Sequence, residues 1–206
     1  WYPEAAGREP FSTAAIILSA TKTLTAATGI VNLYGRDAMV CATGQQTLNE
    51  MSGGRFLLGL GVSHRLFVEG RGHNYEKPLA TMRGYVSAIA ECHKMISVTK
   101  NLAVTGIEEQ PIKLENNGTV VLEDLGEMPI VLAALGPKMM ALSAEISKGA
   151  HPYNTIPEHT AEAREIMGSD AWLCPMIRVC LTNNASRARE IGRQVLGLYL
   201  QLPNYT

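Results

Sequence analysis

A dominant charge of either sign is absent from this sequence. Its 206 residues carry 18 Lys and Arg against 19 Asp and Glu, a formal net charge of −1. A balance of this kind provides no field of one sign to hold nucleic acid or an anionic membrane. We therefore expect no nucleic-acid partner and no membrane partner, and we expect the ligand to be a small molecule.

Long hydrophobic runs are missing too. The longest, such as FLLGLGV and PIVLAAL, are far shorter than the roughly 20 residues that span a bilayer, and no signal-peptide pattern opens the chain. Hydrophobic residues still make up 46% of the sequence, which is enough to fill a sizeable core. These features predict a globular cytoplasmic protein.

Cysteine is scarce and lacks the spacing of a metal site. The four cysteines are Cys41, Cys92, Cys174 and Cys180. None belongs to a CxxC or zinc-finger pattern, and all lie in apolar surroundings. We expect reduced thiols in the core, no disulfide and no metal.

What the sequence does contain is a repeated pattern of helix, stop and strand. Ser12 and Asp37 are candidate N-caps for the first two helices, and Gly53 is a candidate C-cap for the second. Helices are expected near residues 11–23, 37–51, 78–98, 137–148, 157–167 and 185–200. Strands are expected near residues 24–31, 55–61, 130–134, 150–153 and 172–181.

Strands without polar alternation that are separated by helices indicate a parallel sheet covered on both faces. The segment GLGVSH, residues 59–64, lacks the third glycine of a dinucleotide-binding turn and leads into a long polar loop. Several strand ends instead carry Asn32, Ser63, His64, Gly136, Asn154 and Thr155. Polar groups at the carboxyl ends of several strands favour a (β/α)8 TIM-type barrel over a doubly wound sheet.

We expect residues 1–206 to form one barrel domain. A hairpin-like excursion near residues 106–128, around the turn signal Asn117-Gly118, interrupts the α/β pattern. No internal repeat or low-complexity tract suggests a second domain.

Two segments carry a family resemblance. GIVNLYGRDAMVCATGQQTLNEMSGGRFLLGLGVSH and LAALGPKMMALSAEISKGAHPY resemble the bacterial luciferase-like flavin and deazaflavin oxidoreductase superfamily, in particular its F420-dependent branch. The match covers nearly all of the chain outside residues 99–128. By that template the chain starts at the end of the second strand and stops before the eighth, so the resemblance implies an incomplete barrel without its first strand and last unit.

The resemblance implies an oxidoreductase that uses F420, with FMN as the alternative cofactor. Such an enzyme transfers a hydride to or from a small organic substrate, and some members are monooxygenases. His64 would lie beside the cofactor ring and move a proton, since imidazole titrates near neutrality. Glu4, near the end of the second strand of the template, is a further candidate for acid–base catalysis.

The resemblance also implies a cofactor-binding set. Relatives have a non-proline cis peptide at the position of Gly29 and Ile30, behind the ring. Asn32 could bind the ring edge or merely cap a loop. Gly61, with Gly59, could admit the ring or relieve crowding within the barrel, and Ser63 ends the same strand.

For the cofactor phosphate, the candidates are Asn154 and Thr155 before a helix that Pro157 begins, with Gly136 nearby. Relatives often carry a lysine in that turn, and Pro157 stands near its place here, which leaves F420 and FMN both open. Thr155 as a plain N-cap is the structural alternative.

Relatives of this type form homodimers, and the helix near residues 37–51 has more apolar and small positions than one face requires. A homodimer is therefore expected. Two other functions stay open, because a fold does not fix chemistry: a cofactor-free hydrolase or lyase, and a non-catalytic binding or assembly protein.

Overall fold

The computed structural model describes residues 1–4, 7–103, 113–114, 118–119, 128–197, 199–203 and 205. Its strands are β1 (Ala26–Ala27), β2 (Val31–Asn32), β3 (Phe56–Gly61), β4 (Lys113–Leu114), β5 (Gly118–Thr119), β6 (Ile130–Leu132), β7 (Gly149–Ala150) and β8 (Trp172–Leu173). Its α-helices are α1 (Pro10–Ser19), α2 (Ala38–Ser52), α3 (Arg65–Glu69), α4 (Pro78–Ala103), α5 (Pro137–Ile146), α6 (Pro157–Met167) and α7 (Ala185–Leu196).

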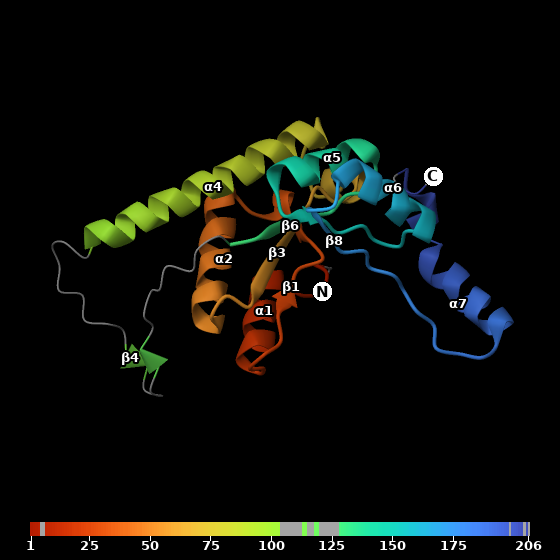
Figure 1. Ribbon diagram of the computed structural model, residues 1–206, viewed down its shortest axis with the longest axis horizontal. Coiled ribbons are helices and arrows are strands. Elements are labelled where there is room, and N and C mark those ends of the chain that lie inside the picture. The colour runs from red at the N-terminus through yellow and green to blue at the C-terminus, as the bar shows by residue number, and fades with distance from the viewer. Residues whose placement is uncertain are drawn as a thin grey trace.

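The main sheet is parallel and forms a half-barrel. Its strand order is β1-β3-β6-β7-β8, with β2 also paired to β3. The N-terminal segment extends it through a parallel bridge between Tyr2 and Thr28. Each covering helix contacts the next, α1 with α2, α2 with α4, α4 with α5 and α5 with α6. These helices curve around one side of the sheet, and the other side is open (Figure 1).

The sheet and the first helices enclose the larger of two hydrophobic cores. Phe56, Leu58 and Leu60 of β3 are buried there against α1, α2 and α4. A second core joins α5 and α6 to β7 through alanine and methionine side chains, among them Met140 and Ala150. A strand buried on both faces explains why the sequence of β3 shows no polar alternation.

The signals at the ends of α2 are confirmed. Asp37 Oδ1 accepts a hydrogen bond from Val40 N at 2.8 Å, and Gly53 ends the helix with a φ of 64°. The cap expected for α1 is wrong. Glu9 caps that helix and accepts from the backbone of Ser12 at 2.6 Å, because Pro10 occupies the first helical position and moves the start forward.

The strand expected near residues 24–31 is interrupted. β1 and β2 are separate, and the Gly29–Ile30 peptide between them is cis, as the family resemblance implied. Thr28 maintains the contact with β3, since its hydroxyl donates to Gly59 O at 2.9 Å and accepts from Gly59 N at 2.8 Å.

Gly59 and Gly61 are explained by neighbouring strands. A Cβ at Gly59 would lie 1.9 Å from the carbonyl oxygen of Thr28, and one at Gly61 would lie 2.5 Å from the Ile30 side chain. The closest approach to both positions is made by protein atoms. Crowding within the half-barrel therefore accounts for both glycines, and their contact with a cofactor ring stays a prediction.

Later strands are shorter than expected. The strand near residues 150–153 is β7 with a bridge from Tyr153 to Met176, and the strand near residues 172–181 is reduced to β8. Beyond Met176 the described part of the chain forms no strand, and Val179 and Leu181 are exposed. An apolar sequence becomes a strand only where a neighbouring strand pairs with it. This segment leads to α7, which buries no residue and stands away from the body (Figure 1).

Other differences concern loops and thiols. The polar loop after β3 contains the short helix α3, and α7 ends at Leu196 before a 3-10 turn, Tyr199–Gln201. All four cysteines are free, but Cys180 is exposed and is not a core residue, because it follows the end of β8.

Within the expected excursion, β4 and β5 pair antiparallel. Residues 104–112, 115–117 and 120–127 of this stretch lie outside the described residues. In the described part of the chain, no helix is long and apolar enough to cross a membrane.

Candidate active site

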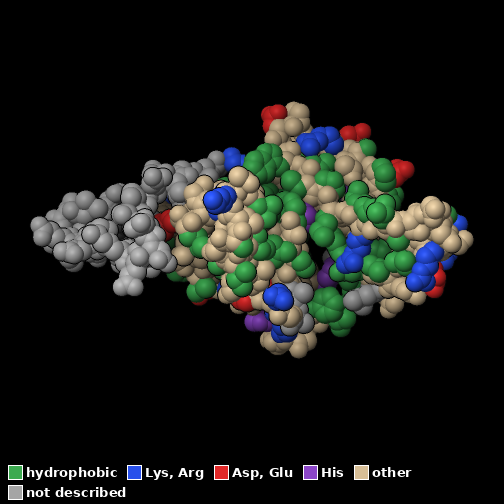
Figure 2. All heavy atoms as spheres, turned by 90° about the horizontal axis from the view of Figure 1, so that it is seen from below, with side chains coloured by type: hydrophobic (Ala, Val, Ile, Leu, Met, Phe, Trp, Pro, Cys, Tyr) green, Lys and Arg blue, Asp and Glu red, His purple; other side chains and the backbone are tan. Residues whose placement is uncertain are grey.

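A cavity of about 1780 Å³ opens where the parallel strands end. Its wall includes side chains that follow β2, β3, β6 and β7, because the carboxyl ends of parallel strands meet at one edge of a sheet. Figure 2 shows a hollow in this region, with many hydrophobic side chains around it and histidine atoms at its edge. The cavity therefore occupies the place in the fold where barrel proteins bind ligands.

His64 is the titratable side chain that β3 delivers to this cavity. It caps α3, and its carbonyl accepts from Phe67 N at 3.0 Å and Val68 N at 3.1 Å. Its ring lies 5.8 Å from that of Phe67 and 6.3 Å from that of Tyr205. Burial lowers the pKa of His64 below its ordinary value of 6.5, so the imidazole is neutral at pH 7 and can accept a proton.

Glu4 also lines the cavity, but its carboxylate is held by other groups. Arg36 donates to both carboxylate oxygens, at 2.9 and 3.2 Å, and the backbone N of Asn32 donates at 2.6 Å. Both side chains are largely buried, at 18% exposed for Glu4 and 9% for Arg36. These three hydrogen bonds tie Glu4 to the end of β2, which supports a positioning role in place of the acid–base role expected from the sequence.

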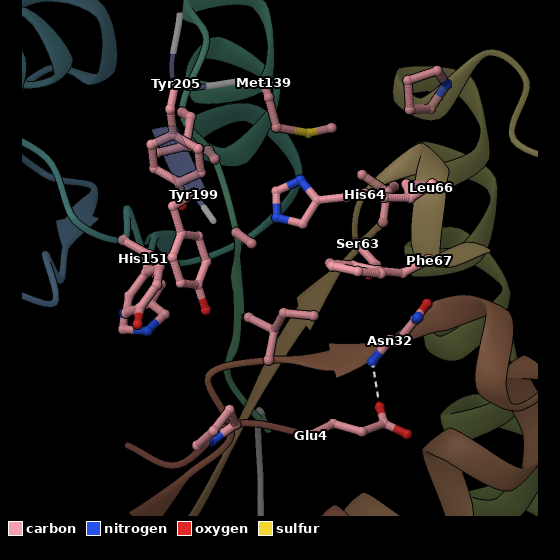
Figure 3. A pocket seen from close by; sticks show the side chains of 18 of the residues that line it. Glu4, Asn32, Ser63, His64, Leu66, Phe67, Met139, His151, Tyr199 and Tyr205 are labelled. Atoms are coloured by element: carbon pink, nitrogen blue, oxygen red, sulfur yellow. Dashed lines mark hydrogen bonds between the residues drawn. The ribbon is translucent and has the colours of Figure 1, made fainter. Parts of the chain in front are cut away.

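Asn32 performs the structural role that the sequence left open. Its Oδ1 accepts from Tyr34 N at 3.0 Å and caps the 3-10 turn Leu33–Gly35. The side-chain amide still lines the cavity. Figure 3 shows Asn32 between Glu4, to which its backbone is bonded, and the cluster around His64.

Six of the expected site residues lie in the cavity wall: Glu4, Ile30, Asn32, Ser63, His64 and Gly136. Ser63 has a positive φ of 58°, which turns the chain sharply as β3 ends. Four expected residues are outside the wall: Gly29, Gly61, Asn154 and Thr155. Gly29 faces His151 and Gly61 faces Ile30, so other side chains separate these two glycines from the cavity.

Asn154 and Thr155 are next to the cavity without lining it. Their neighbour Tyr153 is in the wall, and the backbone N of Asn154 donates to Met176 O at 2.9 Å. The side-chain N and O of Asn154 and the hydroxyl of Thr155 are buried with no hydrogen-bond partner among the described residues. Thr155 is not the cap of α6, whose N-cap is Ile156.

Sequence reasoning named Gly136 at the start of α5 but missed the residues that follow it. Gly136, Pro137, Lys138 and Met139 all line the cavity, and the N-cap Gly136 provides no side-chain cap. Pro137 has no N–H, and the N–H groups of Met139 and Met140 donate to Gly136 O at 3.1 and 3.0 Å, so the Lys138 side chain is the main anion-binding group of this helix start. The signal was present as Gly-Pro-Lys after a buried strand, a helix start with a cation in its first turn.

Arginines and tyrosines at the cavity were missed as well. The cavity-lining cations other than Lys138 are Arg8, Arg71 and Arg178. Arg178 donates to the hydroxyl of Tyr153 at 2.7 Å and lies over the rings of Tyr153 and Tyr199. These residues belong to segments far apart in the chain, and no local pattern indicates that they meet.

His151, which directly follows β7, is 3% exposed in the cavity wall. Its Nδ1 lies 2.7 Å from Cys174 O, and its ring stacks on Trp1 at 4.0 Å between centroids. Burial lowers the pKa of His151, so it is neutral as well. His73 does not line the cavity. Among the described residues, no group of three or more His, Cys, Asp or Glu could hold a metal ion.

The fold and cavity define a class: a parallel α/β half-barrel with a large cavity at the carboxyl ends of the strands. Comparison with known proteins gives the family. Residues 1–200 match the family described as Luciferase-like monooxygenase, and the chain belongs to that family.

Curated relatives include a 5,10-methylenetetrahydromethanopterin reductase of Methanolobus tindarius, 32% identical over 69% of this chain and 41% of the relative. Another, from Mycobacterium tuberculosis, carries the name of a coenzyme F420-dependent oxidoreductase. It is 28% identical over 96% of this chain and 62% of its own length. The chain thus spans about half the length of these relatives.

Solved structures support the fold. A coenzyme F420-dependent tetrahydromethanopterin reductase from Methanopyrus kandleri aligns with a TM-score of 0.54 and 19% identity, over 81% of this chain and 51% of that one. A monooxygenase from Streptomyces bottropensis aligns with a TM-score of 0.60 and 15% identity, over 91% and 60%.

Proposed function

We propose that this chain provides the cofactor site of an F420-dependent oxidoreductase that acts on a small organic substrate. The observation that carries the proposal is a neutral, half-buried His64 in a large cavity at the strand ends of a luciferase-like half-barrel. Relatives named for F420-dependent reactions support this choice of cofactor.

The residues present fit such a cofactor. The cavity of about 1780 Å³ is large enough for a tricyclic ring with a phosphate tail. Asn32 and Ser63 would meet the ring edge, and Gly136 and Lys138 would meet the phosphate at the start of α5. Asn154 and Thr155, which precede α6, have unpartnered polar atoms that would complete the anion site after a local side-chain movement.

F420, when bound, supplies the carbon that gives or takes the hydride. His64 would accept the proton of a substrate hydroxyl, or return it to a carbonyl oxygen in the reverse direction. Glu4 and Arg36 would hold the end of β2 and with it Asn32. The apolar wall would exclude water from this step.

Titration with F420 and, separately, with FMN tests the cofactor assignment. We expect F420 to bind, with a change in its absorbance and fluorescence, and FMN to bind more weakly. A protein that binds neither cofactor would contradict the proposal and would favour a cofactor-free binding or assembly role. Tighter binding of FMN, with oxygen consumed when reduced FMN is supplied, would move the assignment to a flavin-dependent monooxygenase, in line with the monooxygenase activity that the family description names.

Two variants test the proposed phosphate end. Lys138→Ala should weaken F420 binding by roughly tenfold, because it removes a charged partner of the phosphate. Thr155→Val should also weaken binding, with little effect on turnover at saturating cofactor. Lys94→Ala is the matched control, since Lys94 is an exposed lysine on α4 that pairs with Glu91 and does not line the cavity. Equal effects of Lys94→Ala and Lys138→Ala would contradict this assignment.

A further inference from the structure

We propose that the substrate beside His64 is an uncharged molecule with an apolar, preferably aromatic, body and one oxygen that hydrogen-bonds to the imidazole. This inference rests on the proposed function and names its substrate class. It comes from the side chains that surround His64 and not from the activities of relatives.

Two aromatic rings contact the His64 ring. Phe67 meets it in a T-shaped arrangement, with ring planes at 77°, and Tyr205 meets it at 43°. Tyr199 in turn packs against Tyr205 with 5.7 Å between ring centroids. Figure 3 shows Tyr199 and Tyr205 facing His64 from one side, with Met139 above it and Phe67 below. The space next to the imidazole is thus bordered mainly by apolar surface.

Two apolar side chains of α3 remain open to this space. Leu66 is 66% exposed and Phe67 is 43% exposed, and both line the cavity. Val68, on the same short helix, is fully buried and anchors it. Adjacent apolar side chains that face a cavity in this way favour a ligand that removes their surface from water.

The charged side chains that line the cavity either bond to other protein groups or are exposed to solvent. Glu4 is paired with Arg36, and Arg178 is bonded to Tyr153. The cations Arg8, Arg71 and Lys138 are exposed residues. Burial raises the pKa of Tyr205, so its phenol stays neutral at physiological pH. A charged substrate group placed among Phe67, Tyr199 and Tyr205 would lose hydration and would meet three neutral side chains with no opposite full charge among them.

Three secondary alcohols test whether the cavity prefers an uncharged aromatic, a charged aromatic or a small aliphatic substrate. They differ only in the groups attached to one carbinol carbon. They are 1-phenylethanol, mandelate, which has a carboxylate in place of the methyl group, and 2-propanol, which has a methyl in place of the phenyl group. Calorimetric titration of the cofactor-free protein and of the F420-loaded protein measures their binding. We expect 1-phenylethanol to bind at least roughly tenfold more tightly than either of the others.

Phe67→Ala should reduce the affinity for 1-phenylethanol several-fold and leave F420 binding unchanged. Ile16→Ala is the matched control, since Ile16 is 67% exposed on α1 and does not line the cavity. His64→Gln should weaken the binding of all three alcohols by a similar factor, because it alters the contact between the side chain at position 64 and the hydroxyl group that all three share.

Two results would overturn the inference: mandelate binding as tightly as 1-phenylethanol, or Phe67→Ala leaving the preference intact. The first would indicate that the exposed cations select an anionic substrate. Because alcohol binding is measured with and without cofactor, a failure to bind F420 would overturn the proposed function separately.

Discussion

At the scale of single residues, the cavity assigns different roles to the groups that could titrate in it. His64 lies against aromatic rings and keeps a neutral imidazole, whereas the Glu4 carboxylate is bound by a guanidinium and a backbone amide. The surroundings of His64 suit proton transfer, and those of Glu4 suit holding the end of β2 in place.

His64 should titrate below the ordinary histidine value of 6.5, because burial disfavours the charged form. NMR titration of histidine-labelled protein measures this, with the signal assigned by its loss in His64→Ala. The neutral base should then persist at neutral pH and be lost only as the pH falls through the lowered pKa. A pKa above 6.5 would contradict the burial of the ring.

Turnover should fall by roughly 100-fold or more in His64→Ala, with cofactor affinity nearly unchanged, as is usual for the loss of one general acid or base. The measurement is the rate of F420 reduction at saturating cofactor. His73→Ala is the control, since His73 belongs to the same loop but does not line the cavity. Normal turnover in His64→Ala would rule out the proton-transfer role.

Glu4→Gln should lower the free energy of unfolding by about 2 kcal/mol, because it breaks a largely buried ion pair with Arg36. It should also weaken cofactor binding, since the end of β2 is released. Chemical denaturation and F420 titration measure the two effects. The control Glu145→Gln breaks the exposed pair with Arg83 and should leave stability unchanged. Equal stability of both variants would contradict the role of Glu4 in holding the end of β2.

At the scale of elements, β3 determines the geometry of the site. It pairs with β1, β2 and β6, and its glycines allow the neighbouring strands to approach. Ser63 and His64 follow shortly after the last strand residue, Gly61, so any shift of β3 moves the candidate proton acceptor.

Gly59→Ala should destabilise the fold by about 3 kcal/mol, because the added methyl would lie 1.9 Å from the Thr28 carbonyl oxygen and the backbone would have to move. Chemical denaturation checks this. Gly84→Ala on α4 is the control, with nothing within 4 Å of its Cβ, and should stabilise the helix by about 0.5 to 1 kcal/mol. A folded Gly59→Ala of wild-type stability would contradict the crowding explanation.

At the scale of the whole molecule, we expect association into a homodimer. The helix α2 exposes Met39, Val40 and Met51, and apolar surface of this kind favours a protein partner. Light scattering at micromolar concentration should give about twice the chain mass of 22.3 kDa. Val40→Lys should shift the mass toward that of one chain, and a monomeric unmodified protein would contradict the expectation.

The sequence by itself determined the local features. Asp37 and Gly53 set the ends of α2 through contacts within a few residues, and alternating helices and strands indicated a parallel α/β sheet. It also placed His64 at a strand end, because the glycine-rich strand and the polar loop are adjacent along the chain. The cis peptide at Gly29–Ile30 followed from the family resemblance.

Only the tertiary structure decided what depends on residues far apart in the chain. The partner of Glu4 is Arg36, and the atoms that crowd Gly59 belong to Thr28. The ring of His64 contacts the ring of Tyr205, which lies more than a hundred residues later in the sequence. Such contacts have no local signal, because side-chain packing and ion pairing are set by the path of the whole chain through space.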